Sequence, residues 1–378
     1  MDKRALAAGC AVAFAFSANY TNHAPMVSAL RGDFGFDNTH AGLLTTGIFL
    51  THALMQVPGG RLADRFGPAR VLAVALGWVV ACNLAISFSN AYWQLLFWKT
   101  VTGIGTGACF AAGARYIVGH FKGRDLHIAQ GMFGGSIVLG SGFVLFVIPR
   151  LLGAFGWRGG FIGSAIVSAT VWLWWMLGAT PPLHPTAAAG SIPEVMKSRQ
   201  LWLLGLVQMA SFGLVIVVGT WITTLLKTVF QMPLKTAGLM GSAVLLLGIV
   251  SRPLGGWLVH RMRIRSLVQG ALLLNSIACA ALAWAHWNGL AMAAIVALGF
   301  GCGLPYAGAF NRAAALYPGR AGSAMGLVNM IGIFMILVGA PAVGYLADWT
   351  GQFQSSFLAL GVFSLLAAGA ASAIPDES

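Results

Sequence analysis

The chain has 378 residues, of which 58% are hydrophobic and only 8% are charged, and this composition excludes an ordinary soluble globular protein. The net charge of +13 is scattered over short segments, so it indicates membrane topology and not nucleic-acid binding. The five cysteines lie in apolar segments without CxxC spacing, and we expect them to be packing residues, with no metal or disulfide framework.

Apolar runs of about 20 residues recur along the chain, and each is long enough to cross a hydrocarbon core of roughly 30 Å. We therefore expect an all-α integral membrane protein with twelve transmembrane helices. The first run is too long for a cleaved signal peptide and should stay as the first helix. The predicted spans are residues 5–30, 41–62, 70–90, 94–118, 127–150, 157–179, 201–226, 236–258, 265–286, 289–314, 322–347 and 352–373.

The second half of the chain repeats the first at an offset of 196 residues. Gly103–Gly107 matches Gly299–Gly303, because 299 − 103 = 196, and Gly123-Arg124 matches Gly319-Arg320. We expect two pseudo-symmetric six-helix bundles, with a solute path between them at the repeat interface. The predicted domains are residues 1–180, a Pro/Ala-rich linker over 181–200, and residues 201–378.

Loop charge predicts the orientation of these spans. If the N-terminus lies inside, the inner segments carry 13 lysines and arginines and the outer segments carry 5. Positive residues concentrate on the cytoplasmic side of membrane proteins. We therefore expect a multi-pass protein of the cell's inner (plasma) membrane, with both termini and the linker in the cytoplasm.

A short basic turn joins the second and third spans, in the sequence QVPGGRLADRFGPAR from Gln56 to Arg70. It resembles the loop signature of the major facilitator superfamily, through Gly60, Asp64, Arg65, Gly67 and Arg70. The resemblance implies the twelve-helix fold, alternating access, and a gating role for Gly60, Asp64, Arg65 and Gly67. In the repeated copy, RPLGGWLVHRM, His260 replaces Asp64.

The same resemblance implies a transporter and not an enzyme. No ATP-binding loop or hydrolytic constellation is evident in the sequence. We expect a monomer in the lipid bilayer that handles a small-molecule solute, without a cofactor and without nucleic acid. The likeness is nearest to the nitrate/nitrite and cyanate permease-like branch of the superfamily.

Four basic residues lie inside predicted spans, where a charge is costly and therefore suggests a function. Lys99 begins KTVTGIGTG, which resembles the family's fourth-helix pattern and implies a gating role, although a lysine can also extend outward to the interface. Arg115 could pair with Asp64 to close an inner gate, or it could contact the solute. For Arg312, nearly equivalent in the second half, we favour solute contact.

The fourth of these residues, Arg252, is the main candidate for solute binding. Arg-Pro-x-Gly-Gly resembles the eighth helix of nitrate/nitrite porters, where that arginine holds the anion. A guanidinium presents a planar fork that matches nitrate or carboxylate oxygens. Gln56 stands at the matching place in the first half, so the two-arginine clamp of those porters is missing and a small anion remains the expectation. The alternative is a structural arginine that bonds backbone carbonyls.

Polar side chains in other spans are weaker candidates for lining a solute cavity. In the first span, Asn19 and His23 share a helix face, because they are one turn apart, and Asn22 lies beside them. A packed and hydrogen-bonded histidine is the alternative for His23. The remaining candidates are Gln56, Gln208, Tyr306, Asn311 and Asn329.

Two other transport functions and one non-transport function compete with anion transport. None of the nine acidic residues lies inside a predicted span, and this disfavours a cation or drug exporter. His23 with Met26 and His52 with Met55 are spaced i, i+3 and could bind copper(I) in a metal carrier. A membrane sensor that does not transport is the third alternative.

The charge asymmetry predicts which reagents reach the linker. A cysteine introduced between residues 183 and 198 should react only with thiol reagents that enter the cytoplasm. The measurement is labelling of intact cells by a membrane-impermeant maleimide, compared with lysed cells. Labelling from outside intact cells would reverse the predicted orientation.

Overall fold

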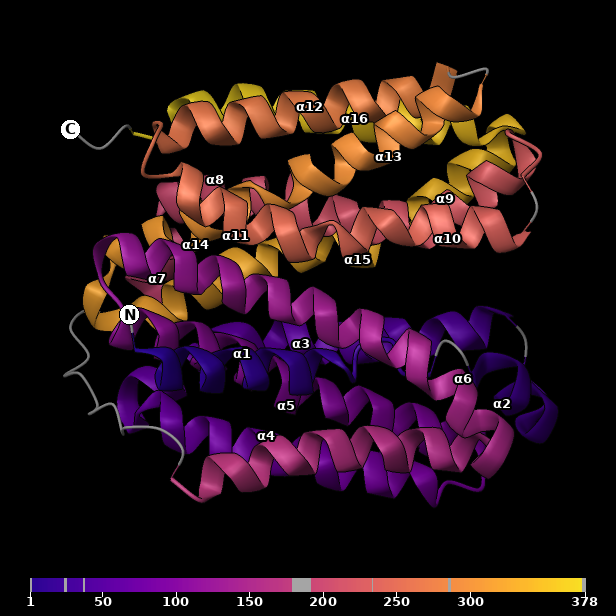
Figure 1. Ribbon diagram of the computed structural model, residues 1–378, viewed down its shortest axis with the longest axis horizontal. Coiled ribbons are helices and arrows are strands. Elements are labelled where there is room, and N and C mark those ends of the chain that lie inside the picture. Colours follow the sequence, from indigo (N-terminus) through magenta and orange to yellow (C-terminus); the bar gives the residue numbers. More distant parts are fainter. Residues whose placement is uncertain are drawn as a thin grey trace. The chain divides into compact units, whose positions relative to one another are not determined.

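The structure is a computed structural model of the chain. It describes residues 2–23, 26–36, 38–178, 192–232, 234–284 and 287–375, so most of the predicted linker lies outside the described residues. The chain packs into two compact units (Figure 1). Unit 1 comprises residues 1–122, 136–192 and 314–326, and unit 2 comprises residues 123–135, 193–313 and 327–378.

The elements of unit 1 are helices from the first sequence half together with one short segment from the second. That segment, residues 314–326, contains a 3₁₀ turn and the start of α15. The N-terminal part of α6 packs with unit 2 instead. The elements are α1 (Lys3–Ser17), α2 (Val27–Phe34), α3 (Asn38–Phe66), α4 (Pro68–Ser87), α5 (Tyr92–His120), α6 (Gly123–Met176) and η3 (Pro318–Arg320).

Unit 2 contains the helices of the second sequence half and the first residues of α6. Within it, α12 packs along α13 and α16. Its elements are α7 (Ile192–Lys197), α8 (Arg199–Gln208), η2 (Met209–Gly213), α9 (Leu214–Thr228), α10 (Leu234–Leu246), α11 (Gly248–Leu258), α12 (Ile264–Trp284), α13 (Asn288–Gly303), α14 (Pro305–Leu316), α15 (Ala321–Thr350), α16 (Phe353–Ala370) and η4 (Ala371–Ala373).

The helices agree with the predicted spans. Within the described ranges, nine helical segments are long and apolar enough to cross a membrane. The second and fifth predicted spans coincide with α3 and the N-terminal part of α6, and the first predicted span covers α1 and the start of α2. The fifth and sixth spans run together as α6, but Gly156 at φ 62° and ψ −173° interrupts the helical backbone between them. The positive φ there is readily adopted only by glycine.

The first predicted span is not one continuous helix. α1 ends at Ser17 and α2 begins at Val27, with turns from residue 18 to residue 23. The Asn19 amide donates to the carbonyl oxygen of Ala15 at 2.7 Å. Such a side chain competes with the backbone for helical hydrogen bonds and favours helix ends. The apolar pattern conceals this break because the flanking residues are hydrophobic on both sides.

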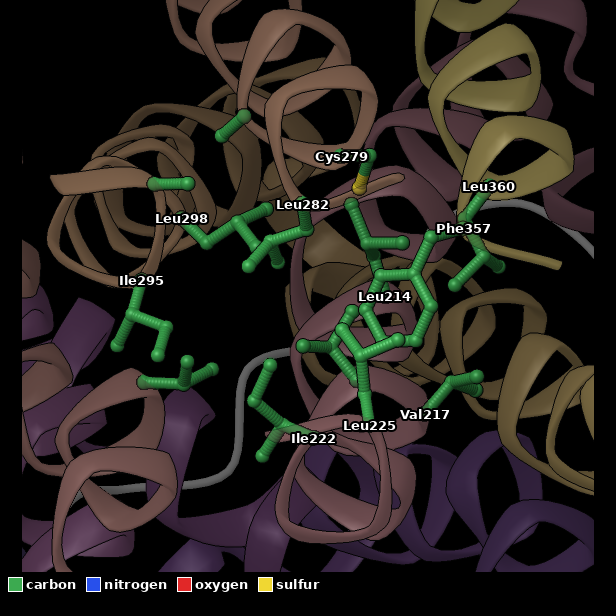
Figure 2. Packing of buried hydrophobic residues seen from close by; sticks show 14 of the residues in the cluster. Leu214, Val217, Ile222, Leu225, Cys279, Leu282, Ile295, Leu298, Phe357 and Leu360 are labelled. Carbon is green, nitrogen blue, oxygen red and sulfur yellow. The ribbon is translucent and has the colours of Figure 1, made fainter. Parts of the chain in front are cut away.

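An apolar cluster fills the interior of unit 2 (Figure 2). Phe357 of α16 is fully buried and lies near Leu214 of α9 and Cys279 of α12 in the view. Lipid is as apolar as a leucine side chain, so helix packing in a membrane depends on close van der Waals contact. Leu366, on the same helix as Phe357, is 68% exposed and is therefore available to lipid.

Phe357→Ala should destabilise the protein, because it leaves a cavity among helices that depend on contact. Large-to-small substitutions of this type cost about 3–5 kcal/mol in soluble cores. We expect a clear fall in the thermal unfolding midpoint of the purified protein in detergent. Leu366→Ala is the matched control and should change the midpoint little. Equal shifts for the two variants would contradict this role for the cluster.

Candidate solute-binding and gating sites

The buried carboxylate of Asp64 is the centre of the predicted gate. Its side chain is 1% exposed. Arg115 on α5 donates from Nε to Oδ1 at 3.1 Å. The backbone N–H groups of Gly322 and Ser323 donate at 3.2 Å each, and the Ser323 hydroxyl donates to Oδ2 at 3.1 Å. We call these four residues the Asp64 latch. It joins α3 to the start of α15 within unit 1.

Glycine makes the close approach at the latch possible. Gly60 lies one turn before Asp64, and a Cβ at Gly60 would collide with the backbone of Gly322. The carboxylate then meets the first N–H groups of α15, where helix dipoles favour negative charge. Gly67 has φ 86° and precedes the first residue of α4. Arg65 is exposed and lies over the Phe66 ring at 5.1 Å.

Lys99 lies apart from the other predicted gating residues. It is fully buried on α5, and its Nζ donates to the Asn19 carbonyl oxygen and to Asn22 Oδ1, both at 2.6 Å. Arg115 is 16 residues further along the same helix, which corresponds to about 24 Å. Lys99 therefore donates to acceptors in the segment between α1 and α2. Its side chain does not extend outward to the membrane–water interface.

The predicted polar cluster of the first span is assembled around this lysine in unit 1. The Asn22 amide donates to Asn83 Oδ1 at 3.1 Å, and His23 Nε2 contacts Thr45 Oγ1 at 3.0 Å. His52, a candidate with Met55 for copper, contacts Thr106 Oγ1 through Nδ1 at 2.9 Å. Among the described residues no three His, Cys, Asp or Glu side chains form a group that could hold a metal ion.

Arg252 is 3% exposed on α11 in unit 2. Its Nη1 donates to the carbonyl oxygen of Gly134 at 2.6 Å. The guanidinium lies over the ring of Tyr306 at 4.6 Å and over the ring of Phe212 at 5.7 Å. The carbonyl bond is the contact expected of a structural arginine. The aromatic neighbours add the desolvated setting in which a guanidinium binds most strongly.

The other predicted solute contacts on α14 lie at different places in unit 2. The Tyr306 ring lies against the Arg252 guanidinium, and a Cβ at Gly134 would collide with the Tyr306 ring. Asn311 is 5% exposed, and its Nδ2 lies 2.8 Å from Nδ1 of His127 at the start of α6. Arg312 is partly exposed. The structure therefore separates Tyr306, next to Arg252, from Asn311, next to a histidine.

Two buried glutamines have amide groups that find no hydrogen-bond partner among the described residues. Gln56 on α3 in unit 1 is one of the predicted cavity residues, and it is fully buried. Gln130 on α6 in unit 2 is not predicted from the sequence, and it is fully buried as well. It lies one turn before Gly134, the residue that Arg252 binds. A buried unsatisfied amide costs about 1–3 kcal/mol, so both positions suit a ligand that would satisfy them.

Gln130 and Ser323 are not predicted from the sequence, and the reason is the same for both. A polar residue near the end of an apolar span is common, and it draws attention only when its neighbours are known. The repeat offset is the available signal, because Ser323 follows Gly319-Arg320 as His127 follows Gly123-Arg124. The same offset pairs Arg115 with Asn311, since 311 − 115 = 196, and not with Arg312.

A helical membrane bundle with an internal repeat is the architecture of many secondary transporters. The family comparison agrees: the sequence model of the Major Facilitator Superfamily matches residues 9–332 and again 265–377. This chain belongs to the Major Facilitator Superfamily.

Curated relatives span nearly the whole chain. A probable sulfoacetate transporter of Cupriavidus necator is 27% identical, and the alignment covers 95% of this chain and 89% of the relative. A probable nitrate/nitrite antiporter of Thermus thermophilus is 22% identical, with 88% and 82% covered. Among solved structures, the human organic anion transporter MFSD10 aligns with a TM-score of 0.81 at 16% identity, over 98% of this chain and 99% of that one. This structural likeness confirms the fold.

Asp64→Asn should slow transport and leave affinity for a solute held by Arg252 nearly unchanged, because it removes the charge that holds the latch and Arg252 is not a member of that latch. A lost hydrogen bond to a charged group corresponds to about a tenfold or larger effect on the latched equilibrium. The measurement is the rate of solute exchange in proteoliposomes, beside a binding titration on the purified protein. Asp33→Asn is the matched control, because that carboxylate is 54% exposed. Equal losses of binding and transport would assign Asp64 to folding instead.

Proposed function

We propose that this protein is a secondary transporter that moves a small organic anion by alternating access, with Arg252 as the main contact for the negative charge. The observation that carries the proposal is the placement of that guanidinium. It is buried inside a membrane-spanning segment, over the Tyr306 ring and next to the Gly134 carbonyl. A cation held in this way attracts an anion strongly, because little water is present to screen it.

The relatives support an anionic solute. Their names mention sulfoacetate and nitrate or nitrite, all of which carry negative oxygens on a planar or tetrahedral centre. Arginine is the side chain best suited to such groups, since its planar fork donates two parallel hydrogen bonds. This chemistry is shared by carboxylates, sulfonates and nitrate.

Within this class the buried amides favour an organic anion over nitrate. The first sequence half has Gln56 where the nitrate/nitrite porters that the sequence resembles have a second arginine. Gln56 and Gln130 each offer an amide N–H donor and a carbonyl acceptor that no group in the described part of the chain satisfies. Nitrate cannot donate a hydrogen bond to the carbonyl. A larger anion with a hydroxyl or a protonated acid group could satisfy both halves of an amide.

We assign gating to the Asp64 latch, with Arg115 as one of its members. The carboxylate holds the start of α15 against α3, through Arg115 and through the helix N–H groups. Release of this contact would let the inner end of the transporter open. Lys99 belongs by the same reasoning to the break after α1, where it supports the shape of the first span and not the gate.

Loop charge supports a placement for the protein in the cell. The excess of inner lysines and arginines favours a bacterial-type plasma membrane location with both termini in the cytoplasm. We expect a monomer, with each sequence half contributing six spans. No cofactor is needed for this mechanism, because solute gradients drive it.

A ligand screen tests the class of solute directly. The purified protein should gain thermal stability with sulfoacetate or short carboxylates, because a ligand that binds only the folded state raises the unfolding midpoint. Nitrate should give a smaller shift, and neutral sugars and copper(I) should give none. Stabilisation by copper(I) alone would favour the metal-carrier alternative.

Arg252→Lys keeps the positive charge but loses the planar fork. Affinity for the anion found in the screen should fall by about 1–3 kcal/mol, the range for lost charge-assisted hydrogen bonds. Arg252→Ala should nearly abolish binding while the protein still inserts and purifies. The measurement is isothermal titration of each variant.

Gln56→Ala is the matched control, because Gln56 occupies the place of Arg252 in the other half, and it should have a smaller effect. Normal transport by Arg252→Ala would refute the anion contact. The structural role would be favoured by two results together. Arg252→Ala would fail to fold, and Arg252→Lys would fold and bind the anion with unchanged affinity.

A further inference from the structure

Unit 2 contains a second cluster of polar residues. Its members stand 196 residues away from members of the Asp64 latch and are therefore their equivalents in the internal repeat. The offset of 196 residues is the same for each member, and in unit 2 these residues also come together in space. The paired positions are Asp64 with His260, Arg115 with Asn311, and Ser323 with His127.

The second cluster occupies the matching positions, but His127, the counterpart of Ser323, makes both of its contacts. Asn311 Nδ2 lies 2.8 Å from His127 Nδ1, and the rings of His127 and His260 are 4.8 Å apart at 86°. A glycine beside each cluster allows two helices to approach closely. A Cβ at Gly256 would collide with the His127 carbonyl, as one at Gly60 would collide with Gly322. Both contacts join the start of one half's helix to helices of the other half, each within one unit.

We infer that His127, Asn311 and His260 form a second latch, the histidine latch, which holds the start of α6 against α11 and α14 and weakens when the histidines gain protons. The inference rests on the proposed alternating access, because a latch has a role only if these helix ends separate. The three act as positioning residues in this inference, because His127 contacts both Asn311 and His260.

The chemistry of the two latches differs in charge. The Asp64 latch pairs a carboxylate with a guanidinium and with helix N–H groups. In the histidine latch the amide nitrogen of Asn311 donates to Nδ1 of His127, which must then be an unprotonated acceptor. Neutral rings pack against each other without electrostatic cost. The second latch is therefore stable while both histidines are neutral.

Protonation reverses this balance. A proton on His127 Nδ1 turns the acceptor into a donor that faces another donor. Rotation of the Asn311 amide would restore one hydrogen bond but would not remove the repulsion between two cationic rings. The cationic rings would also lie near the first turns of α6, whose dipole favours negative charge. Each effect opposes the closed latch at low pH.

The surroundings of the histidines leave both rings accessible to protons. His260 is exposed and His127 is partly exposed, so protons from the solvent reach them. One carboxylate, Asp125, stands among the charged groups on the elements that pack here. Those groups are Arg124 and Asp125 on α6, Arg261 and Arg263 after α11, Arg265 on α12 and Arg312 on α14. Acid on this side of the protein would open the latch, because it supplies the protons that the histidines gain.

The experiment measures latch opening without any solute. A cysteine replaces Leu126, next to His127, in a background where the five native cysteines are serine or alanine. Its alkylation rate is measured from pH 7.5 to pH 5.5. The same cysteine is measured in the variant His127→Ser, Asn311→Arg, His260→Asp, which rebuilds the Asp64 latch at the second position. The ratio of the two rates cancels the pH dependence of the thiol itself.

We expect this ratio to rise about fivefold on acidification, the size expected for two like charges 4.8 Å apart that are screened as in bulk water. His260→Gln alone should flatten most of the rise, because it keeps a hydrogen-bonding side chain but cannot become charged. His120→Gln is the matched control, since His120 bonds the Tyr116 carbonyl at the end of α5 in unit 1. It should leave the rise intact.

A ratio of alkylation rates that stays constant with pH would overturn the inference. A rise in the His260→Gln variant as large as in the protein with His260 would overturn it as well. If the triple variant does not fold, His260→Gln serves as the reference for the ratio. Because no solute is present, the outcome is independent of whether Arg252 binds an anion. Failure of the solute screen and failure of the histidine latch are therefore distinguishable.

Discussion

The absence of water in the bilayer core is the constraint on which this structure depends. Every polar group within a span must find its partner inside the protein, because hydrocarbon offers none. The Lys99 ammonium binds a carbonyl and an amide oxygen, and the Arg252 guanidinium binds a carbonyl and lies over aromatic rings. Within the described ranges the buried amides of Gln56 and Gln130 depart from this rule. Departures of this kind are expected where a ligand completes the structure.

A few charged side chains of this transporter are buried, and Asp64 is one of them. The Asp64 carboxylate is the sole acidic group of the basic turn between the second and third spans, and it is bound by Arg115 and by two helix N–H groups. Breaking one partner of a buried pair leaves the other charge without compensation, and that costs more than the pair gains by forming. A latch built in this way closes in one defined geometry, which suits a protein that alternates between two states.

The internal repeat places glycines at matching positions in both halves of the chain, but the chemistry at other matching positions differs. The offset of 196 residues preserves the glycines that permit close approach, such as Gly60 and Gly256. It does not preserve the residues that these glycines bring together. One half has an arginine where the other has a glutamine, as with Arg252 and Gln56. The two halves therefore place different side chains, one charged and one neutral, at matching buried positions.

The sequence by itself determined the helical membrane class, the repeat and the residues most costly to bury, because apolar length, glycine spacing and intramembrane charge are local properties. It also singled out Asp64, Arg115 and Arg252. Only the tertiary structure decided their partners: Ser323 is 259 residues from Asp64, and Gly134 is 118 residues from Arg252. Likewise, the break after Ser17 depends on Asn19 and on the distant Lys99, which hydropathy does not register. Contacts between residues far apart in the chain are set by helix packing, and helix packing cannot be inferred from any single segment of the sequence.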